Sequence, residues 1–177
     1  MDNKQLIPIQ RLLEEIKAQM GGGTTDTFDY LSTPYYVLRV NANTVGVAYA
    51  TAGIRLNTTV EVSITDISNM IATSDDVIYA LIKNPTIANE SWTAINGDVD
   101  SLDVDNENNP STVTITGGTL VKTLFTTSGF AGGGAQFNTV ESILLEQNDV
   151  YVLAVVPTQF GANADAFGAI NFKIKTN

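Results

Sequence analysis

Two segments in the last quarter of the chain constrain the fold most. The first is an uninterrupted apolar run, Val150–Val156, which ends at Pro157. It is rich in β-branched residues and too short for the helix of a domain core, so it predicts a strand buried on both faces. The second segment, Phe167–Lys175, alternates apolar residues such as Ile170 with polar residues such as Asn171. This period of two predicts a strand with one wet face, and the two strands are expected to pair as a central strand and its neighbour.

Shorter segments upstream have the same β character. They are rich in β-branched and aromatic residues, and turn residues separate them, which predicts about eight or nine strands in all. The expected strands cover residues 35–40, 45–56, 59–65, 77–83, 113–116, 119–127 and 143–145. Gly117 and Gly118 favour a hairpin between the two segments that flank them. These patterns predict a mainly β domain, a β-sandwich of the jelly-roll type, and leave the strand order open.

Other stretches of the β region do not have a strand pattern. Residues 84–111 contain six acidic and no basic residues and are expected to be irregular. Ser128–Gln136 is expected to be a loop, because its Gly and Ala residues offer a packed strand little to bury. Asp66–Ser74 is compatible with a short helix.

The N-terminal segment has a helical pattern instead. Pro8 suits a first helical turn, good helix formers follow it, and Gly21–Gly23 ends the helix. The apolar residues recur at alternating intervals of three and four, which is the spacing of a heptad seam. The residues of this seam are Leu6, Ile9, Leu13, Ile16 and Met20.

Three roles for this amphipathic helix remain open, namely self-association, docking to another protein and packing on its own domain. Leu at the first seam position and Ile at the second favour bundles of three or four helices over pairs. The polar Gly linker after the helix is flexible. We therefore expect two parts, with residues 1–23 serving for anchoring or oligomerisation and residues 24–177 forming the β domain.

The composition excludes several classes of function. The 177-residue chain has no Cys and no His, which removes disulfides, imidazole-based triads and ordinary zinc sites. Its net charge of −10 disfavours binding to nucleic acid and to anionic membrane surfaces. The N-terminus lacks the pattern of a secretory signal, so synthesis in a cytoplasm is expected. We expect no cofactor, no nucleic-acid partner and no membrane partner.

The acidic stretch contains the candidates for a metal site, which are Asp98, Asp100, Asp103 and Asp105. Alternate side chains of an extended segment point to one side, so either pair of neighbours could share a Ca²⁺ ion through carboxylate oxygens. The spacing is not that of an EF-hand. The alternative is a solvated acidic loop in which Asp and Asn form turns, and on this interpretation no metal is expected.

The remaining candidates for chemistry are an aromatic ring and a few carboxylates. Trp92 is the only Trp; an exposed ring could stack on a sugar, whereas a buried ring would anchor a loop. Hydrolysis of glycosides would need two partnered carboxylates. Glu90, Glu141 and Glu146 are candidates, but no spacing marks two of them as partners. We therefore expect no enzymatic activity.

Segments spread over residues 78–175 carry a family resemblance. They are Asn84–Ile95, Leu102–Asp105, Val113–Leu120, the strand that begins at Val150, and Asn163–Phe172. In these segments the chain resembles a recurrent module of tailed-bacteriophage structural proteins. The resemblance implies a virion component without an active site, commonly a trimeric β-sandwich.

The expected function follows from this resemblance. It implies an accessory protein on a phage capsid, of the decoration, cement or head-fibre type, made in the host cytoplasm and located in the virion. The expected partners are copies of itself in a homotrimer and other virion proteins such as the major capsid protein. The alternative is a receptor- or carbohydrate-binding module of a tail or neck fibre, with Trp92 and the acidic and Gly-rich loops as its recognition surface.

Overall fold

The computed structural model describes residues 26–34, 36–40, 46–71, 77–104, 113–126, 134–158 and 164–176. Within these ranges the protein is mainly β, and all strand pairs are antiparallel. The described ranges contain no helix long and apolar enough to cross a membrane. The expected N-terminal helix and the Gly linker lie outside the described residues.

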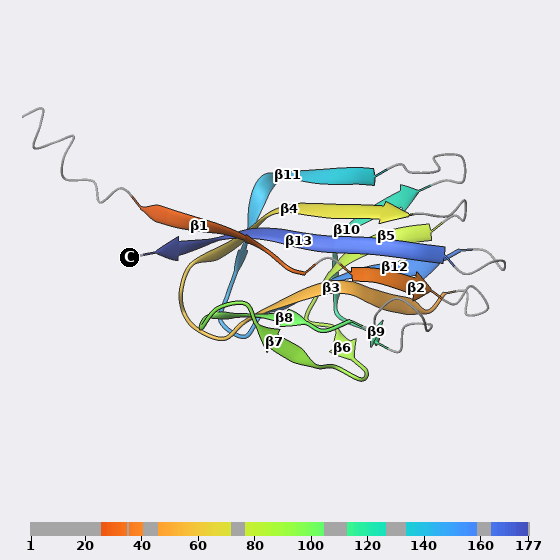
Figure 1. Cartoon of the computed structure of the whole chain (residues 1–177), viewed down its shortest axis with the longest axis horizontal. Coiled ribbons are helices and arrows are strands. Elements are labelled where there is room, and N and C mark those ends of the chain that lie inside the picture. Colours follow the sequence, from red (N-terminus) through yellow and green to blue (C-terminus); the bar gives the residue numbers. More distant parts are fainter. Residues whose placement is uncertain are drawn as a thin grey trace, which may run out of the picture.

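The first sheet is organised around one long strand, β13 (Ala164–Thr176). β4 (Val62–Ile71) lies on one side of it, and β11 (Gly134–Leu145) pairs with the far side of β4. β1 (Thr27–Ser32) and β2 (Tyr36–Val40) share the other side, where β1 pairs with the second half of β13 and β2 with the first half. Figure 1 shows these strands side by side, with the C-terminal end of the chain next to the start of β1.

The second sheet is organised around β12 (Val150–Pro157), which lies between β5 (Val77–Lys83) and β3 (Ala48–Leu56). β10 (Thr119–Thr126) pairs with the outer side of β5. Four short strands complete the sheet beyond and beside β3. They are β6 (Thr86–Ile87), β7 (Trp92–Ala94), β8 (Val99–Leu102) and β9 (Thr114–Thr116).

Two apolar clusters position these strands. The shared cluster joins both sheets and includes Ile67 and Ile170 from the first sheet and Leu153 from the second. The outer cluster lies on the other face of the second sheet, where Val152 packs with residues such as Leu102. Because β12 contributes to both clusters, the prediction that it is buried on both faces is confirmed.

The chain passes repeatedly from one sheet to the other. β3, β4 and β5 alternate between the sheets, and so do β10, β11, β12 and β13. The expected pairing of the last two strands is therefore wrong, because β12 and β13 belong to different sheets. Their contact is through the shared cluster and not through a ladder of backbone hydrogen bonds.

Several local expectations need correction. A short helix over Asp66–Ser74, with which the sequence is compatible, is wrong for the described residues 66–71, since β4 continues to Ile71 and pairs with strands on both sides. Residues 134–136 begin β11, so pairing with β4 outweighs their low strand propensity. The stretch from 84 to 111 was expected to be irregular, but it contains β6, β7 and β8.

The hairpin expected around Gly117 and Gly118 does not form. Both glycines have the positive φ that a tight turn uses, 64° and 80°. The strands on either side nevertheless diverge, because β9 pairs with β3 and β6 whereas β10 pairs with β5. The sequence pattern therefore predicts the turn residues correctly but not the pairing partners of the two strands.

Candidate functional site

The residues predicted from the sequence fall into two groups. The heptad seam lies outside the described residues, as does Asp105; the members of the seam are Leu6, Ile9, Leu13, Ile16 and Met20. Asp98, Asp100, Asp103 and Trp92 lie in or beside the short strands next to β3. This second group is therefore the part of the predicted site whose geometry is known.

Asp100 forms an ion pair across two neighbouring strands. Arg55 of β3 and Asp100 of β8 are register partners, which brings Arg55 Nη2 to 2.6 Å from Asp100 Oδ2. Burial works to raise the pKa of Asp100, but hydrogen bonds from Asn57 and Arg55 outweigh it and hold the pKa below its usual value. The carboxylate thus stays ionised as the partner of a guanidinium.

The same guanidinium lies over the ring of Trp92, with its central carbon 4.7 Å from the ring centroid. Trp92 is half-buried and packs against the outer cluster. Its Nε1 donates a hydrogen bond to Glu90 Oε2 at 2.9 Å. One ring face is thus occupied by Arg55, an arrangement that corresponds to the loop-anchoring alternative for Trp92.

The other two described aspartates have separate partners. Asp98 Oδ1 accepts a hydrogen bond from Thr58 Oγ1 at 2.9 Å. Asp103 Oδ2 accepts hydrogen bonds from Ser91 Oγ at 2.9 Å and from Thr93 Oγ1 at 3.1 Å. Among the described residues, no three acidic side chains gather in a way that could hold a metal ion. These carboxylates tie the short strands together through neutral and cationic donors.

A third group was not anticipated from the sequence. Asp149, in the turn before β12, is buried and accepts from three donors: Lys83 Nζ at 2.8 Å, the Glu146 backbone N–H at 2.9 Å and Asn84 Nδ2 at 3.3 Å. Asn84 Oδ1 in turn accepts from the backbone N–H of Val150 at 2.7 Å. The only signals in the sequence were an Asn before Pro85 and an acidic residue before a central strand.

The electrostatics of this group favour an ion pair. Burial works to raise the pKa of Asp149, but the hydrogen bonds from Lys83, Glu146 and Asn84 outweigh it and lower the pKa. The hydrogen bond with Asp149 raises the pKa of Lys83 despite some burial. Both groups are therefore charged at neutral pH, which suits a structural clamp and not a proton-transfer pair.

The sheet edges at β10 and β11 carry exposed apolar side chains. In β10, Leu120 and Val121 are 59% and 40% exposed, and in β11 Leu144 is 57% exposed. Within the described part of the chain, each of these strands pairs on one side only. The β10 edge also has a register shift between Leu120 and Lys122, and Lys122 lines a small internal gap beside Leu153. An irregular edge with an inward-pointing Lys resists the addition of another strand, so this surface is suited to contact through side chains.

The described residues therefore offer one stacked ion pair, one buried charged clamp and one apolar edge surface. None of the three has the form of a nucleophile with its base, because the carboxylates of the first two are paired with Arg55 and Lys83. Comparison of the chain with protein-family models, with curated proteins and with solved structures found no match.

Proposed function

We propose that this chain is a non-enzymatic structural component of a bacteriophage virion, an accessory capsid protein of the decoration, cement or head-fibre type. Copies of the β domain associate as a closed trimer, and residues 1–23 gather at its axis or dock on the capsid. Repetition of such a unit over a shell gives avidity even where each contact is weak. The partners are other copies of the chain and the major capsid protein.

The observation that carries this proposal is the nested pairing of the strands. The first and last strands pair (β1 and β2 with β13), then β3 with β12, β4 with β11, and β5 with β10. An eight-stranded antiparallel ribbon folded over on itself gives this order, with β6 to β9 as an insertion between its two innermost strands. We infer a β-sandwich of the jelly-roll type, a fold used by viral capsid proteins and also by lectins.

Support for the virion assignment comes from the sequence, because fold by itself does not specify function. The segments that resemble phage structural proteins include Asn84–Ile95 and Val113–Leu120, which span β6, β7 and β9. The chain also lacks Cys, one of the common nucleophiles of enzymes, and His, their commonest general base. A mechanical role accounts for both features together.

Support for self-association comes from one sequence pattern and one exposed surface. The heptad spacing from Leu6 to Met20 favours a bundle of three or four helices. The exposed side chains of Leu120, Val121 and Leu144 add apolar area on two strands at the edges of the sheets. Because the chain carries a net charge of −10, association has to rest on such apolar contacts and is expected to strengthen with salt.

A truncation tests the proposal. A variant without residues 1–23 is expected to keep its β-sheet circular dichroism, because the described strands begin at Thr27. It is expected to lose co-sedimentation with phage capsids, whereas the full chain co-sediments. The control is the full chain with Leu13→Ala and Ile16→Ala, which leaves the length unchanged and weakens only the seam. The proposal would be contradicted if the truncated chain co-sedimented with capsids as well as the full chain does, or if the full chain did not co-sediment at all.

A further inference from the structure

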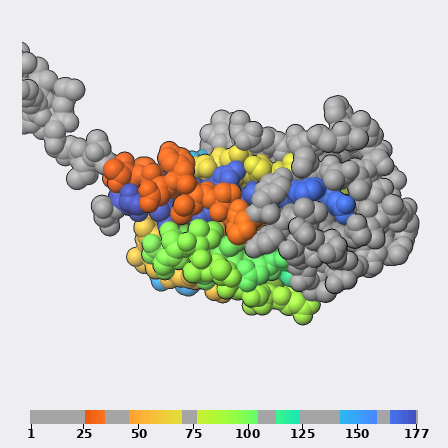
Figure 2. All heavy atoms as spheres, in the orientation of Figure 1, coloured from red at the N-terminus to blue at the C-terminus, as the bar shows by residue number. Residues whose placement is uncertain are grey.

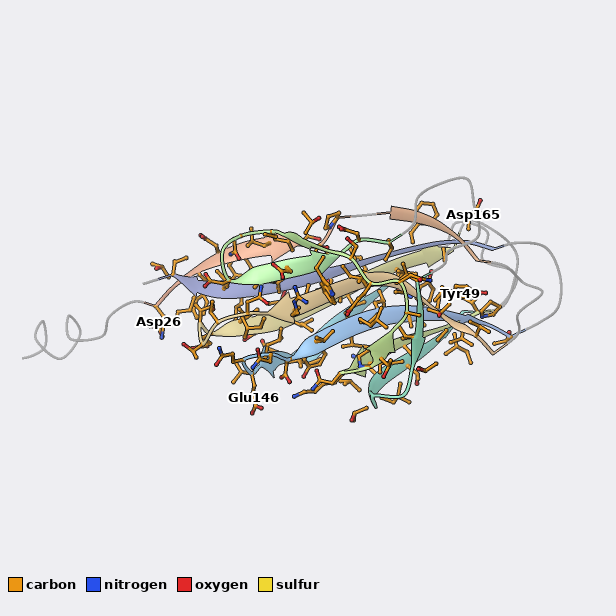
Figure 3. All side chains as sticks on the ribbon, turned by 90° about the horizontal axis from the view of Figure 1, so that it is seen from below. Asp26, Tyr49, Glu146 and Asp165 are labelled. Carbon is orange, nitrogen blue, oxygen red and sulfur yellow. The ribbon has the colours of Figure 1, made fainter. Side chains whose placement is uncertain are left out.

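An open hollow of about 650 Å³ lies at the end of the molecule where the chain enters and leaves the β domain. Its walls come from β1, from the connection between β3 and β4, from the turn between β7 and β8, and from the end of β13. Figure 2 shows β1 beside the β7–β8 region on this face. Figure 3 labels Asp26, the partner of the wall residue Lys175, at the end opposite Asp165.

The walls of the hollow are held in place by hydrogen bonds. Asn96 Oδ1 accepts from the backbone N–H groups of Asp98 and Val99, at 2.9 and 2.8 Å, which fixes the turn between β7 and β8. Asp98 in turn links this turn to the β3–β4 connection by accepting from Thr58 Oγ1. The Lys175 backbone N–H donates to Glu61 O at 2.9 Å. The cavity is thus preformed, as most ligand sites are.

Several polar groups in the hollow are not used by the chain. Among the described residues, the Asp29 carboxylate and the Thr59 hydroxyl are exposed to solvent and have no protein hydrogen-bond partner, and Asn96 uses its oxygen but not its Nδ2 donors. The partly buried Val60 supplies apolar surface beside them, whereas Ile174 lines the hollow but is only 3% exposed. The hollow therefore presents acceptors, donors and an apolar patch within one space.

We propose that this hollow binds a neutral saccharide. Sugar hydroxyls both donate and accept, so they match the Asp29 acceptor, the Asn96 donors and the Thr59 hydroxyl together. The C–H face of the ring packs on Val60. An anionic ligand would face the carboxylates of Asp29 and Asp98, while the ammonium of the wall residue Lys175 is already paired with Asp26. A purely cationic group would leave the donors unmatched.

Trp92, whose ring is covered on one face by Arg55, does not line the hollow. Binding of a saccharide in the hollow requires neither self-association nor a particular position of the chain in a virion. It gives the β domain a ligand of its own, beyond the proposed structural role. The volume is in the range of sites for small ligands, about 300–1,000 Å³.

The test is binding of the full chain to an array of neutral, anionic and amine-bearing glycans. Chitin and chitosan oligomers of equal length form a matched pair, because they differ in whether each amine is acetylated and neutral or free and cationic. The expected result is binding to neutral glycans. Asp29→Ala and Thr59→Ala are expected to weaken that binding by about tenfold or more, since each removes a hydrogen-bonding group.

The control variants are Glu146→Ala and Ser142→Ala, which change exposed polar residues outside the hollow. They are expected to bind like the unchanged chain. Circular dichroism confirms that all four variants are folded. Absence of binding to any neutral glycan, preference for chitosan over chitin, or full binding by both hollow variants would overturn the proposal.

Discussion

At the scale of single residues, Gly168 shows how a side chain is excluded from the core. A Cβ built at this position would lie 2.9 Å from Thr51 Cβ and 2.9 Å from Leu153 Cδ2. Gly168→Ala is therefore expected to lower the free energy of unfolding by about 1–3 kcal/mol through overpacking. Chemical denaturation measures this change.

Gly97 provides the matched control, because a Cβ there meets nothing within 4 Å and its φ is not positive. Gly97→Ala is expected to change stability by less than about 0.5 kcal/mol. Equal effects of the two substitutions would mean that the close approach of β13 to β3 is wrong.

Among the residues that the structure describes, Asn69 is a buried polar residue whose surroundings do not satisfy its side chain. It is 3% exposed, and neither atom of its amide has a hydrogen-bond partner among the described residues. A buried amide without partners costs stability, so Asn69→Leu is expected to raise the free energy of unfolding by about 1–3 kcal/mol. Thermal and chemical unfolding both measure it.

Asn171 gives the comparison, since its Nδ2 donates to Asp66 Oδ2 and Ser68 Oγ, each at 3.2 Å. Asn171→Leu removes these bonds and is expected to destabilise. A loss of stability in Asn69→Leu as large as that in Asn171→Leu would show that the Asn69 amide is satisfied.

At the scale of elements, the clamp around Asp149 joins the end of β5 to the start of β12. The folded-state pKa of Asp149 is lowered from 3.8, so its contribution is present above that value and is lost as the pH falls through the folded-state pKa. The pKa of Lys83 is raised from 10.5, so its contribution is present below 10.5 and is lost as the pH rises through the higher folded-state pKa. Asp149→Asn is therefore expected to destabilise by about 1–3 kcal/mol at neutral pH and to flatten the loss of stability in acid.

Unfolding by denaturant at a series of pH values measures this dependence. Glu146→Gln is the control, because it neutralises an exposed carboxylate in the same turn and leaves the bonds to Asp149 in place. An Asp149→Asn variant with an unchanged acid slope would contradict the clamp.

The elements also show what the sequence can predict. The strand at Val77–Lys83 and the strand that begins at Val150 could be predicted because a continuous apolar run rich in β-branched residues indicates a buried strand. Residues 134–136 and β6 to β8 were missed because their strand structure depends on partners and not on their own propensity. Neither the pairing of Arg55 with Asp100 nor the three donors to Asp149 could be predicted, since both require the register between distant strands.

At the scale of the whole molecule, the nested strand order is the feature that is hardest to predict from a single sequence. β1 and β13 pair although nearly the whole β domain lies between them in the sequence. Only the folding of the chain brings these two strands together. The sequence predicted a mainly β domain correctly, but it placed β12 and β13 side by side in one sheet. The reason is that apolar patterns report which faces are buried and not which strands are neighbours.

The most direct test of the central claim is the solution mass of the full chain, measured by light scattering during size exclusion. If the proposed homotrimer forms, the measured mass is three times the 18.9 kDa of one chain. The variant without residues 1–23 is expected to give a smaller assembly. A mass of 18.9 kDa for the full chain at every concentration and salt level would contradict self-association.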